Sequence, residues 1–239
     1  MLYSDRRILY LPEMNPKRRA AEAALKFLEN GMVVGLGTGS TADEFLQALG
    51  AALREGRIKD IRGVPTSERS EQRAVELGIP LIKLAEYSRP DVTVDGADEI
   101  APGLDLIKGL GGALLREKIV AQNSARLVII ADAGKTVDKL GTRSPLPVEV
   151  TQFAHEIQAD FLRSLGANPT LRRKPDGAVM VTDNHNYIYD CRFPGGIDKP
   201  GEVEAALRSR AGIVESGLFL GIASVALIAT DDNLEQRNR

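Results

Sequence analysis

Apolar and polar positions follow two different periods along the first 140 residues. Short apolar runs, such as 32–37 and 126–132, predict buried strands, and stretches with one apolar helical face, such as 40–56, predict helices. In chain order the predicted elements are a helix over 17–31, a strand over 32–37, a helix over 40–56, a strand within 58–67, a helix over 70–78, strands over 79–84 and 91–98, a helix over 112–125 and a strand over 126–132. Strands that alternate with helices predict an α/β fold with a mostly parallel sheet covered on both faces.

The pattern changes at 141–150, where two prolines interrupt it. The elements predicted beyond this point are a helix over 151–166, two strands around a polar turn at 182–186, a helix over 199–212 and a strand over 213–219. The apolar run 223–230 is expected to rejoin the main sheet, and the polar segment 231–239 to be a frayed tail. The predicted organisation is a main α/β domain of residues 1–143 and 218–239 and a small α+β domain of residues 144–217.

Composition excludes several classes of partner. The 31 basic and 33 acidic side chains nearly cancel, so nothing favours nucleic acid or an anionic membrane. No apolar stretch approaches the ~20 residues of a membrane span, and charges within residues 1–14 interrupt the apolar core that a signal peptide needs. The single cysteine, Cys191, shares a predicted strand face with Tyr187, Tyr189 and Phe193, which indicates a core cysteine and fits a reducing cytoplasm. Two histidines cannot form a His-rich metal site, but a carboxylate-only magnesium site stays open.

The segment GLGTGST, which follows the first predicted strand, is typical of an anion-binding turn. It is not a dinucleotide fingerprint, because Ser40 occupies the place of the third glycine, and no Gly-Lys-Ser/Thr completes a P-loop. AGKT, at 133–136, is no P-loop either, because Ile129 occupies its first glycine position. Thr38, Ser40 and Thr41 fall at a predicted helix N-terminus, where free N–H groups and the helix dipole favour a phosphate or carboxylate. The alternative is a tight turn with Ser40 or Thr41 as a helix cap.

Three acids follow another predicted strand in the segment VDGADEI. Asp95, Asp98 and Glu99 lie within five residues, and the small residues between them leave the backbone open to a ligand. Taken alone, the segment is either a turn or a magnesium site formed by Asp95 and Asp98. The carboxyl ends of parallel strands are also where open α/β sheets bind ligands, so a functional surface is the third interpretation.

The segment KGLGGALLREK combines a lysine, a glycine-rich turn and a helix glutamate. Gly109, Gly111 and Gly112 let a ligand approach the backbone, with Lys108 before the turn and Glu117 in the following helix. Both charges could simply face solvent. Together with the acids and the anion-binding turn, however, they predict proton transfer on a phosphorylated substrate, in which Glu117 is the base and Lys108 stabilises an enediolate without metal. Burial would have to raise the pKa of Glu117 from about 4.3.

The chain resembles the type A ribose-5-phosphate isomerase family in six segments, which occur in the family's order: GLGTGSTA, VDGADEI, KGLGGALLREKIVA, ADAGKTVDKLG, PLPVEV and VTDN. The resemblance extends from about residue 17 to residue 230. It implies a metal-independent, cofactor-free aldose–ketose isomerase of the non-oxidative pentose phosphate pathway, which interconverts ribose 5-phosphate and ribulose 5-phosphate in the cytoplasm. It further implies a Rossmann-like αβα domain with a ferredoxin-like small domain, assembled as homodimers or homotetramers.

The same resemblance implies a role for each site residue. Glu117 is the base that shuttles a proton between C1 and C2 through a cis-enediolate, Asp95 and Asp98 hold the ring-opening and carbonyl-side hydroxyls, and Lys108 faces the developing oxyanion. The implied substrate-binding set is Thr38, Gly39, Ser40, Thr41, Gly96, Ala97, Gly109, Leu110, Gly111 and Lys135. The 38–41 turn is expected to bind the phosphate end.

The chain departs from the family pattern at three positions. Leu110 replaces a residue that is often Gly or Arg, so the loop is expected to be less open there. His185 stands where glycine is common, and Ser224 replaces an acid near the C-terminus. None of the three is a residue implied in catalysis.

Three other functions are compatible with parts of the pattern. A non-catalytic sugar-phosphate sensor would carry a helix-turn-helix and a basic face, and would not need Glu117, Asp95 and Lys108 together. A coenzyme A transferase relative would use a glutamate as a covalent acyl carrier, normally in a longer or two-part chain. Another pentose or hexose phosphate isomerase on the same scaffold is the third.

Overall fold

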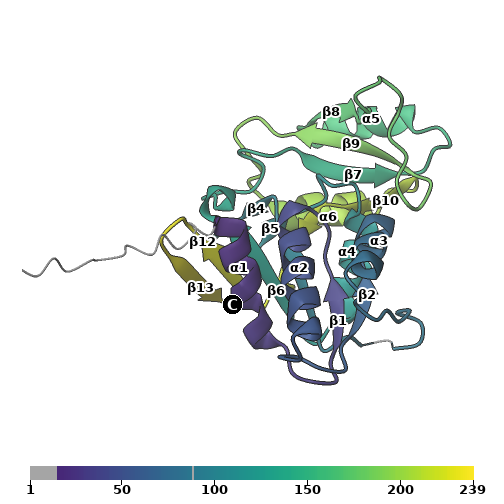
Figure 1. Ribbon diagram of the computed structural model, residues 1–239. Helices are drawn as coiled ribbons and strands as arrows, with labels where there is room; N and C mark the ends of the chain where they lie inside the picture. Colours follow the sequence, from purple (N-terminus) through teal and green to yellow (C-terminus); the bar gives the residue numbers. More distant parts are fainter. Residues whose placement is uncertain (1–14, 88) are drawn as a thin grey trace, which may run out of the picture.

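A six-stranded sheet lies at the centre of the fold (Figure 1). The computed structural model describes residues 15–87 and 89–239, so the sequence interpretation of residues 1–14 lies outside the described residues. The strand order is β13-β12-β6-β3-β1-β2, and every neighbouring pair is parallel except β12 with β13. The bounds are Val33–Leu36 for β1, Arg62–Pro65 for β2, Val92–Gly96 for β3, Leu127–Asp132 for β6, Val225–Ala229 for β12 and Leu234–Asn238 for β13.

Alternate residues of the central strands serve two separate cores, because successive strand side chains point to opposite faces. On one face, residues such as Val34 and Ile130 pack with apolar side chains of three helices, α1 (Pro16–Ala24), α2 (Ser40–Arg54) and α3 (Glu68–Glu76). On the other face, Ile129 and its neighbours pack against α4 (Leu114–Asn123) and a three-stranded sheet. That sheet consists of β4 (Glu99–Ile100), β5 (Leu106–Ile107) and β11 (Leu218–Phe219).

A separate four-stranded antiparallel sheet lies beside the central sheet (Figure 1). Its order is β10-β7-β9-β8, with helices α5 (Glu156–Ser164) and α6 (Pro200–Arg208). The bounds are Leu146–Val150 for β7, Asn168–Leu171 for β8, Tyr187–Arg192 for β9 and Ile213–Ser216 for β10. It has its own apolar core, in which Cys191 is fully buried beside Tyr189, as predicted for a core cysteine.

The predicted α/β class, with a mostly parallel central sheet and a smaller antiparallel unit, is confirmed. The division into domains at residues 143/144 and 217/218 stays a prediction. Within the described residues, no helix combines the length and the apolar character needed to cross a membrane.

The prediction of a frayed C-terminal tail is wrong. Residues 234–238 form β13, which pairs with β12 along its whole length, and the Arg239 guanidinium lies 2.7 Å from Asp105 Oδ1. The segment reads as polar because β13 is an edge strand with mostly exposed side chains, while Leu234 packs against the core.

Three local predictions also need correction. The strand expected before the 182–186 turn is absent from the described residues, which have only an isolated bridge there, between Arg173 and Val179; β9 pairs with β8 instead. The strand expected over 79–84 is reduced to one bridge, from Leu81 to Gly63. The cap of α2 is Gly39, with no side-chain cap, rather than Ser40 or Thr41.

We expect removal of residues 231–239 to destabilise the protein. The truncation exposes the edge of β12 and removes its ladder with β13, so the free energy of unfolding should fall by roughly 2–4 kcal/mol, at about 1 kcal/mol for each lost hydrogen bond. Urea denaturation would measure the loss. As a control, Glu235→Ala breaks only the exposed ion pair with Arg237 and should cost less than about 1 kcal/mol. Equal stability of truncated and full-length protein would contradict the assignment of β13.

Candidate active site

The candidate site lies between β1 and β3, where the order in which the chain adds strands to the central sheet reverses. β1 has β2 on one side and β3 on the other, so the connections that leave β1 and β3 diverge at their carboxyl ends. Such a point is the usual ligand crevice of an open parallel sheet. Two hydrogen bonds join the turn after β1 to strand β3: Gly37 N–H donates to Val94 O at 3.0 Å, and Thr38 N–H donates to Asp95 Oδ1 at 3.0 Å.

The close approach of this turn to β3 requires glycine at position 37. A Cβ there would lie 2.2 Å from Asp95 Oδ1 and 2.6 Å from Asp95 Cα, which no rotation of the aspartate could relieve. The first glycine of GTGST therefore makes room for an acid rather than for a ligand.

Lys108 is the centre of a buried ion cluster. It directly follows β5, its side chain is 2% exposed, and its Nζ lies 3.0 Å from both Asp95 Oδ2 and Glu117 Oε1. The Nζ also donates to Gly96 O at 2.6 Å. Burial alone would lower the pKa of Lys108, but the two carboxylates outweigh burial and raise this pKa above its ordinary value. Lys108 is therefore a fixed ammonium between two acids.

Glu117 lies in the first turn of α4 and is 3% exposed. Burial, with a smaller contribution from the charge of Asp95, raises its pKa to about 8, although Lys108 acts in the opposite direction. Its Oε1 accepts from Lys108, whereas Oε2 is buried without a hydrogen-bond partner in the described structure. A carboxylate with one unoccupied oxygen and a pKa near neutrality is suited to accept and return a proton.

The three acids of VDGADEI have three different environments. Asp95 is 1% exposed and is held by Lys108 and two backbone N–H groups. Asp98 is half-buried and accepts from Leu110 N–H at 2.9 Å. Glu99 is fully buried and accepts from the N–H groups of residues 141, 143 and 144, so its function is structural.

The magnesium interpretation of Asp95 and Asp98 loses its basis, because the Lys108 ammonium occupies the cation position beside Asp95 and the Leu110 amide binds Asp98. Over residues 15–87 and 89–239, no group of three or more His, Cys, Asp and Glu side chains could hold a metal ion.

The anion-binding turn forms one end of the site. Gly39, with φ 111°, precedes α2, and Lys17 Nζ donates to Ser40 Oγ at 2.9 Å. The Thr38 hydroxyl lies 2.8 Å from the hydroxyl oxygens of both Thr66 and Ser67, which follow β2. A cationic side chain and a helix N-terminus thus meet at one point, as an anion site requires.

These groups surround a cleft. Its lining residues all belong to the set predicted from sequence: Thr38, Gly39, Ser40, Thr41, Gly96, Ala97, Asp98, Lys108, Gly109, Gly111, Glu117 and Lys135. Two predicted residues do not line it: Asp95 lies beneath Lys108, and Leu110, 39% exposed, contributes its backbone to the turn. His185, which stands where the family pattern commonly has glycine, has a φ of 60°, in the left-handed region that glycine favours.

Sequence reasoning missed Lys17, Thr66 and Ser67. Lys17 lies in α1, separated from Ser40 by 23 positions, and belongs to none of the segments from which the site was predicted. The hydroxyls of Thr66 and Ser67 could have been found, because they follow a predicted strand whose carboxyl end neighbours that of β1.

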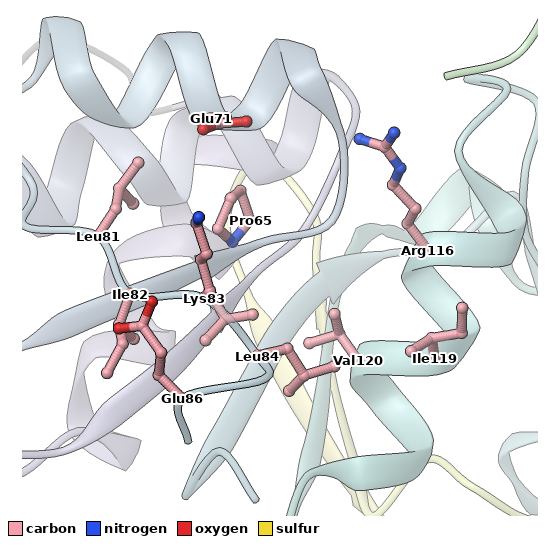
Figure 2. A pocket seen from close by; sticks show the side chains of 11 residues that line it. Pro65, Glu71, Leu81, Ile82, Lys83, Leu84, Glu86, Arg116, Ile119 and Val120 are labelled. Atoms are coloured by element: carbon pink, nitrogen blue, oxygen red, sulfur yellow. The ribbon is translucent and has the colours of Figure 1, made fainter. Parts of the chain in front are cut away.

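A second cavity lies between β2, the 81–86 segment and α4. Figure 2 shows apolar side chains, among them Leu81 and Val120, around this hollow, with Arg116 at one end. Because Glu117 lines the first cleft and Val120 the second, α4 separates the two. The second cavity has no buried acid–base cluster, so its composition does not favour proton transfer.

Comparison with known proteins identifies the family. Residues 62–233 match the family described as ribose 5-phosphate isomerase A (phosphoriboisomerase A). The chain belongs to this family. The ribose-5-phosphate isomerase A of Desulfatibacillum aliphaticivorans is 50% identical over 220 residues, covering 92% of this chain and 95% of that protein. The Roseiflexus castenholzii protein of the same name is 52% identical over 218 residues, covering 91% and 93%.

Solved structures agree with the assignment to the ribose 5-phosphate isomerase A family. Ribose 5-phosphate isomerase from Plasmodium falciparum superposes with a TM-score of 0.90 at 37% identity, covering 93% of this chain and 97% of that one. A D-ribose-5-phosphate isomerase in complex with phospho-erythronic acid gives 0.90 at 40% identity, with the same coverage. The resemblance inferred from six segments, and the expectation of an isomerase, are therefore confirmed.

We expect Glu117→Gln to stabilise the protein at alkaline pH. Because the folded-state pKa of Glu117 is raised to about 8, its ionisation costs stability progressively from the ordinary glutamate range, about 4.3, up to pH 8. The melting temperature of the variant relative to wild type should therefore rise between pH 5 and pH 9, by about 2–4 °C for each kcal/mol relieved. Scanning calorimetry across this range would measure it, and a pH-independent difference would contradict the raised pKa.

Proposed function

We propose that the protein interconverts D-ribose 5-phosphate and D-ribulose 5-phosphate by proton transfer through a cis-enediolate. The observation that carries the proposal is the buried Glu117 carboxylate, with one unoccupied oxygen, beside the Lys108 ammonium in a cleft that ends at a helix N-terminus. The family assignment supports the same reaction, and one solved relative binds a phosphorylated sugar acid, phospho-erythronic acid.

Glu117 acts as the base in this mechanism. In the open-chain aldose, the unoccupied carboxylate oxygen removes the proton from C2, and the electron pair forms the C1–C2 double bond while the C1 carbonyl becomes an oxyanion. Proton exchange between the O1 and O2 oxygens, followed by return of the carbon-bound proton from Glu117 to C1, gives the ketose. A pKa of about 8 allows the same group to take and return the proton near neutral pH.

Lys108 stabilises the developing negative charge. Its ammonium is fixed by Asp95, Glu117 and Gly96 O, so it needs no reorientation during the reaction. This ammonium supplies the positive charge that a metal ion would otherwise provide, and we therefore propose a metal-independent reaction.

The remaining groups hold the substrate. The free N–H groups at the start of α2, the Ser40 hydroxyl, and the ammonium groups of Lys17 and Lys135 suit the phosphate at C5. Asp98 lines the cleft and is free to accept from a sugar hydroxyl with its second oxygen. A direct contact of Asp95 with a hydroxyl stays a prediction, since its buried carboxylate primarily holds Lys108.

The first experiment compares wild type with Glu117→Gln in the conversion of ribose 5-phosphate to ribulose 5-phosphate, with EDTA in excess. Wild-type turnover should survive EDTA, and the variant should lose about 10²–10⁴-fold, because that is the usual worth of a general base. Glu71→Gln is the matched control, since Glu71 is exposed on α3 and should leave turnover unchanged.

Other outcomes would redirect the proposal. Loss of wild-type turnover in EDTA would overturn the metal-independent route. Binding of ribose 5-phosphate without turnover would indicate a sensor, and inactivation by hydroxylamine with an acyl-coenzyme A would indicate a transferase.

We expect Lys108→Met to lower kcat and to shift the pH profile. Lys108 lowers the pKa of Glu117, so its removal should raise that pKa above about 8. The acidic limb of kcat/KM, in which the active carboxylate is lost as pH falls, should move to higher pH. Measurement of kcat and KM from pH 6 to 10 tests this prediction. A change confined to KM would show that Lys108 binds only the ground state.

The oligomer expected from the resemblance, a homodimer or homotetramer, and a cytoplasmic location belong to the same proposal. Multi-angle light scattering of the purified protein would measure the oligomeric state.

A further inference from the structure

A side chain next to the four-stranded sheet contacts the glycine-rich turn of residues 109–112. Arg172, just beyond β8, extends to the glycine-rich segment that follows Lys108, where its Nη1 donates to Gly109 O and to Leu110 O, both at 3.1 Å. The backbone of Arg172 is itself anchored, because its N–H donates to Ile188 O at 2.8 Å.

A carboxylate fixes the guanidinium in this position. Arg172 Nε donates to Asp190 Oδ2 at 2.8 Å, and Nη2 donates to Asp190 Oδ1, which makes the pair bidentate. The Arg172 side chain is 10% exposed, and Asp190 belongs to β9, the neighbour of β8. All the nitrogens of the planar fork are therefore used, two on the acid and one on the two carbonyls, a geometry that lysine cannot reproduce.

These contacts set the orientation of two peptide units. In a trans peptide the C=O and the following N–H point in opposite directions, and cis peptide bonds are absent from the described residues. The Gly109–Leu110 unit has its carbonyl on Arg172 and its N–H on Asp98. The Leu110–Gly111 unit also has its carbonyl on Arg172, so the Gly111 N–H points away from the guanidinium.

The Gly111 N–H has no acceptor among the described protein atoms, and Gly111 lines the cleft beside Thr38. An unoccupied backbone donor on the cleft side is suited to a substrate oxygen. The reversed orientation would instead present the Leu110 carbonyl oxygen to the cleft, where its partial negative charge would oppose an oxyanion.

The glycines of the turn do not fix the orientation of these peptide units by themselves. Gly109 and Gly112 have φ of 99° and 86°, and glycine accepts either peptide orientation at low cost. The turn gains its ligand access from glycine, so a side chain from outside the turn has to select the orientation.

We propose that Arg172, held by Asp190, is a positioning residue that orients the 109–111 peptides and thereby sets both the Gly111 donor and the Leu110–Asp98 contact for the reaction. This inference rests on the proposed isomerase function. It adds the four-stranded sheet to the elements that determine turnover.

The test uses Arg172→Ala, Arg172→Lys and Asp190→Asn in the full chain, with Arg173→Ala as the control. Arg173 is adjacent but exposed, and its guanidinium donates to Gly177 O at 2.8 Å. Arg172→Ala should lower kcat by about 10–100-fold with a smaller change in KM, because a misplacement near 1 Å can cost about 100-fold. Arg172→Lys should recover little of this loss, and Arg173→Ala should stay within about twofold of wild type in kcat.

Addition of guanidinium ion to the assay, at tens of millimolar and below its denaturing concentration, distinguishes lost positioning from general destabilisation. It should restore part of the kcat of Arg172→Ala and leave wild type and Arg173→Ala unstimulated, a response that general destabilisation would not give. A kcat within twofold of wild type, or a loss that guanidinium does not relieve, overturns the proposal. If Arg172→Ala does not fold, Asp190→Asn serves as the test, because an unchanged kcat of Asp190→Asn also overturns the proposal. Inactive wild type would instead refute the proposed function.

Discussion

The site depends on one buried ammonium shared by two carboxylates. Lys108 Nζ is equidistant from Asp95 and Glu117 at 3.0 Å, and all three side chains are almost completely buried. One positive charge cannot fully compensate two carboxylates at low dielectric. Ionisation is therefore less favourable for the carboxylate that accepts fewer hydrogen bonds. Asp95 accepts from two backbone N–H groups, whereas Glu117 accepts from no backbone N–H group, and burial raises the pKa of Glu117.

The fold brings these three charges from three separate elements, and glycines allow the approach. Gly37 leaves room for Asp95 beneath the turn after β1. Gly217 makes a comparable contact with Lys108, since a Cβ there would lie 2.2 Å from Lys108 O, and Lys108 N–H donates to Gly217 O at 2.9 Å. Lys108 is thus fixed by its backbone as well as by its charge, which is the preorganisation that electrostatic catalysis needs.

Sequence patterns indicated which residues of the candidate cleft lie together better than they predicted the edges of the fold. Residues that follow parallel strands meet at one sheet edge whatever the rest of the chain does, so the cleft could be assembled from GTGST, VDGADEI and KGLGG. What separates Asp95, Asp98 and Glu99 is which backbone amides donate to each acid, and all of these amides except that of Gly96 come from other segments of the chain. β13 was missed because an exposed edge strand lacks apolar alternation, and Arg172 because its two target carbonyls carry no residue-type signal.

The four-stranded sheet and the turn that precedes its strand β9 also hold α4 on both sides of Glu117. Arg116 donates to Asp183 O at 2.8 Å and to Asn184 Oδ1 at 3.0 Å, and Lys118 donates to Glu215 at 2.7 Å and to Ser216 O at 2.8 Å. The two neighbours of Glu117 are thus bound to strand β10 and to the turn before strand β9, while the Glu117 side chain contacts Lys108. Since the pKa of Glu117 depends on its separation from Lys108, any displacement between the sheets would change the basicity of the site. The geometry of the candidate site therefore depends on the contact between the four-stranded and the central sheet, and not on the central sheet alone.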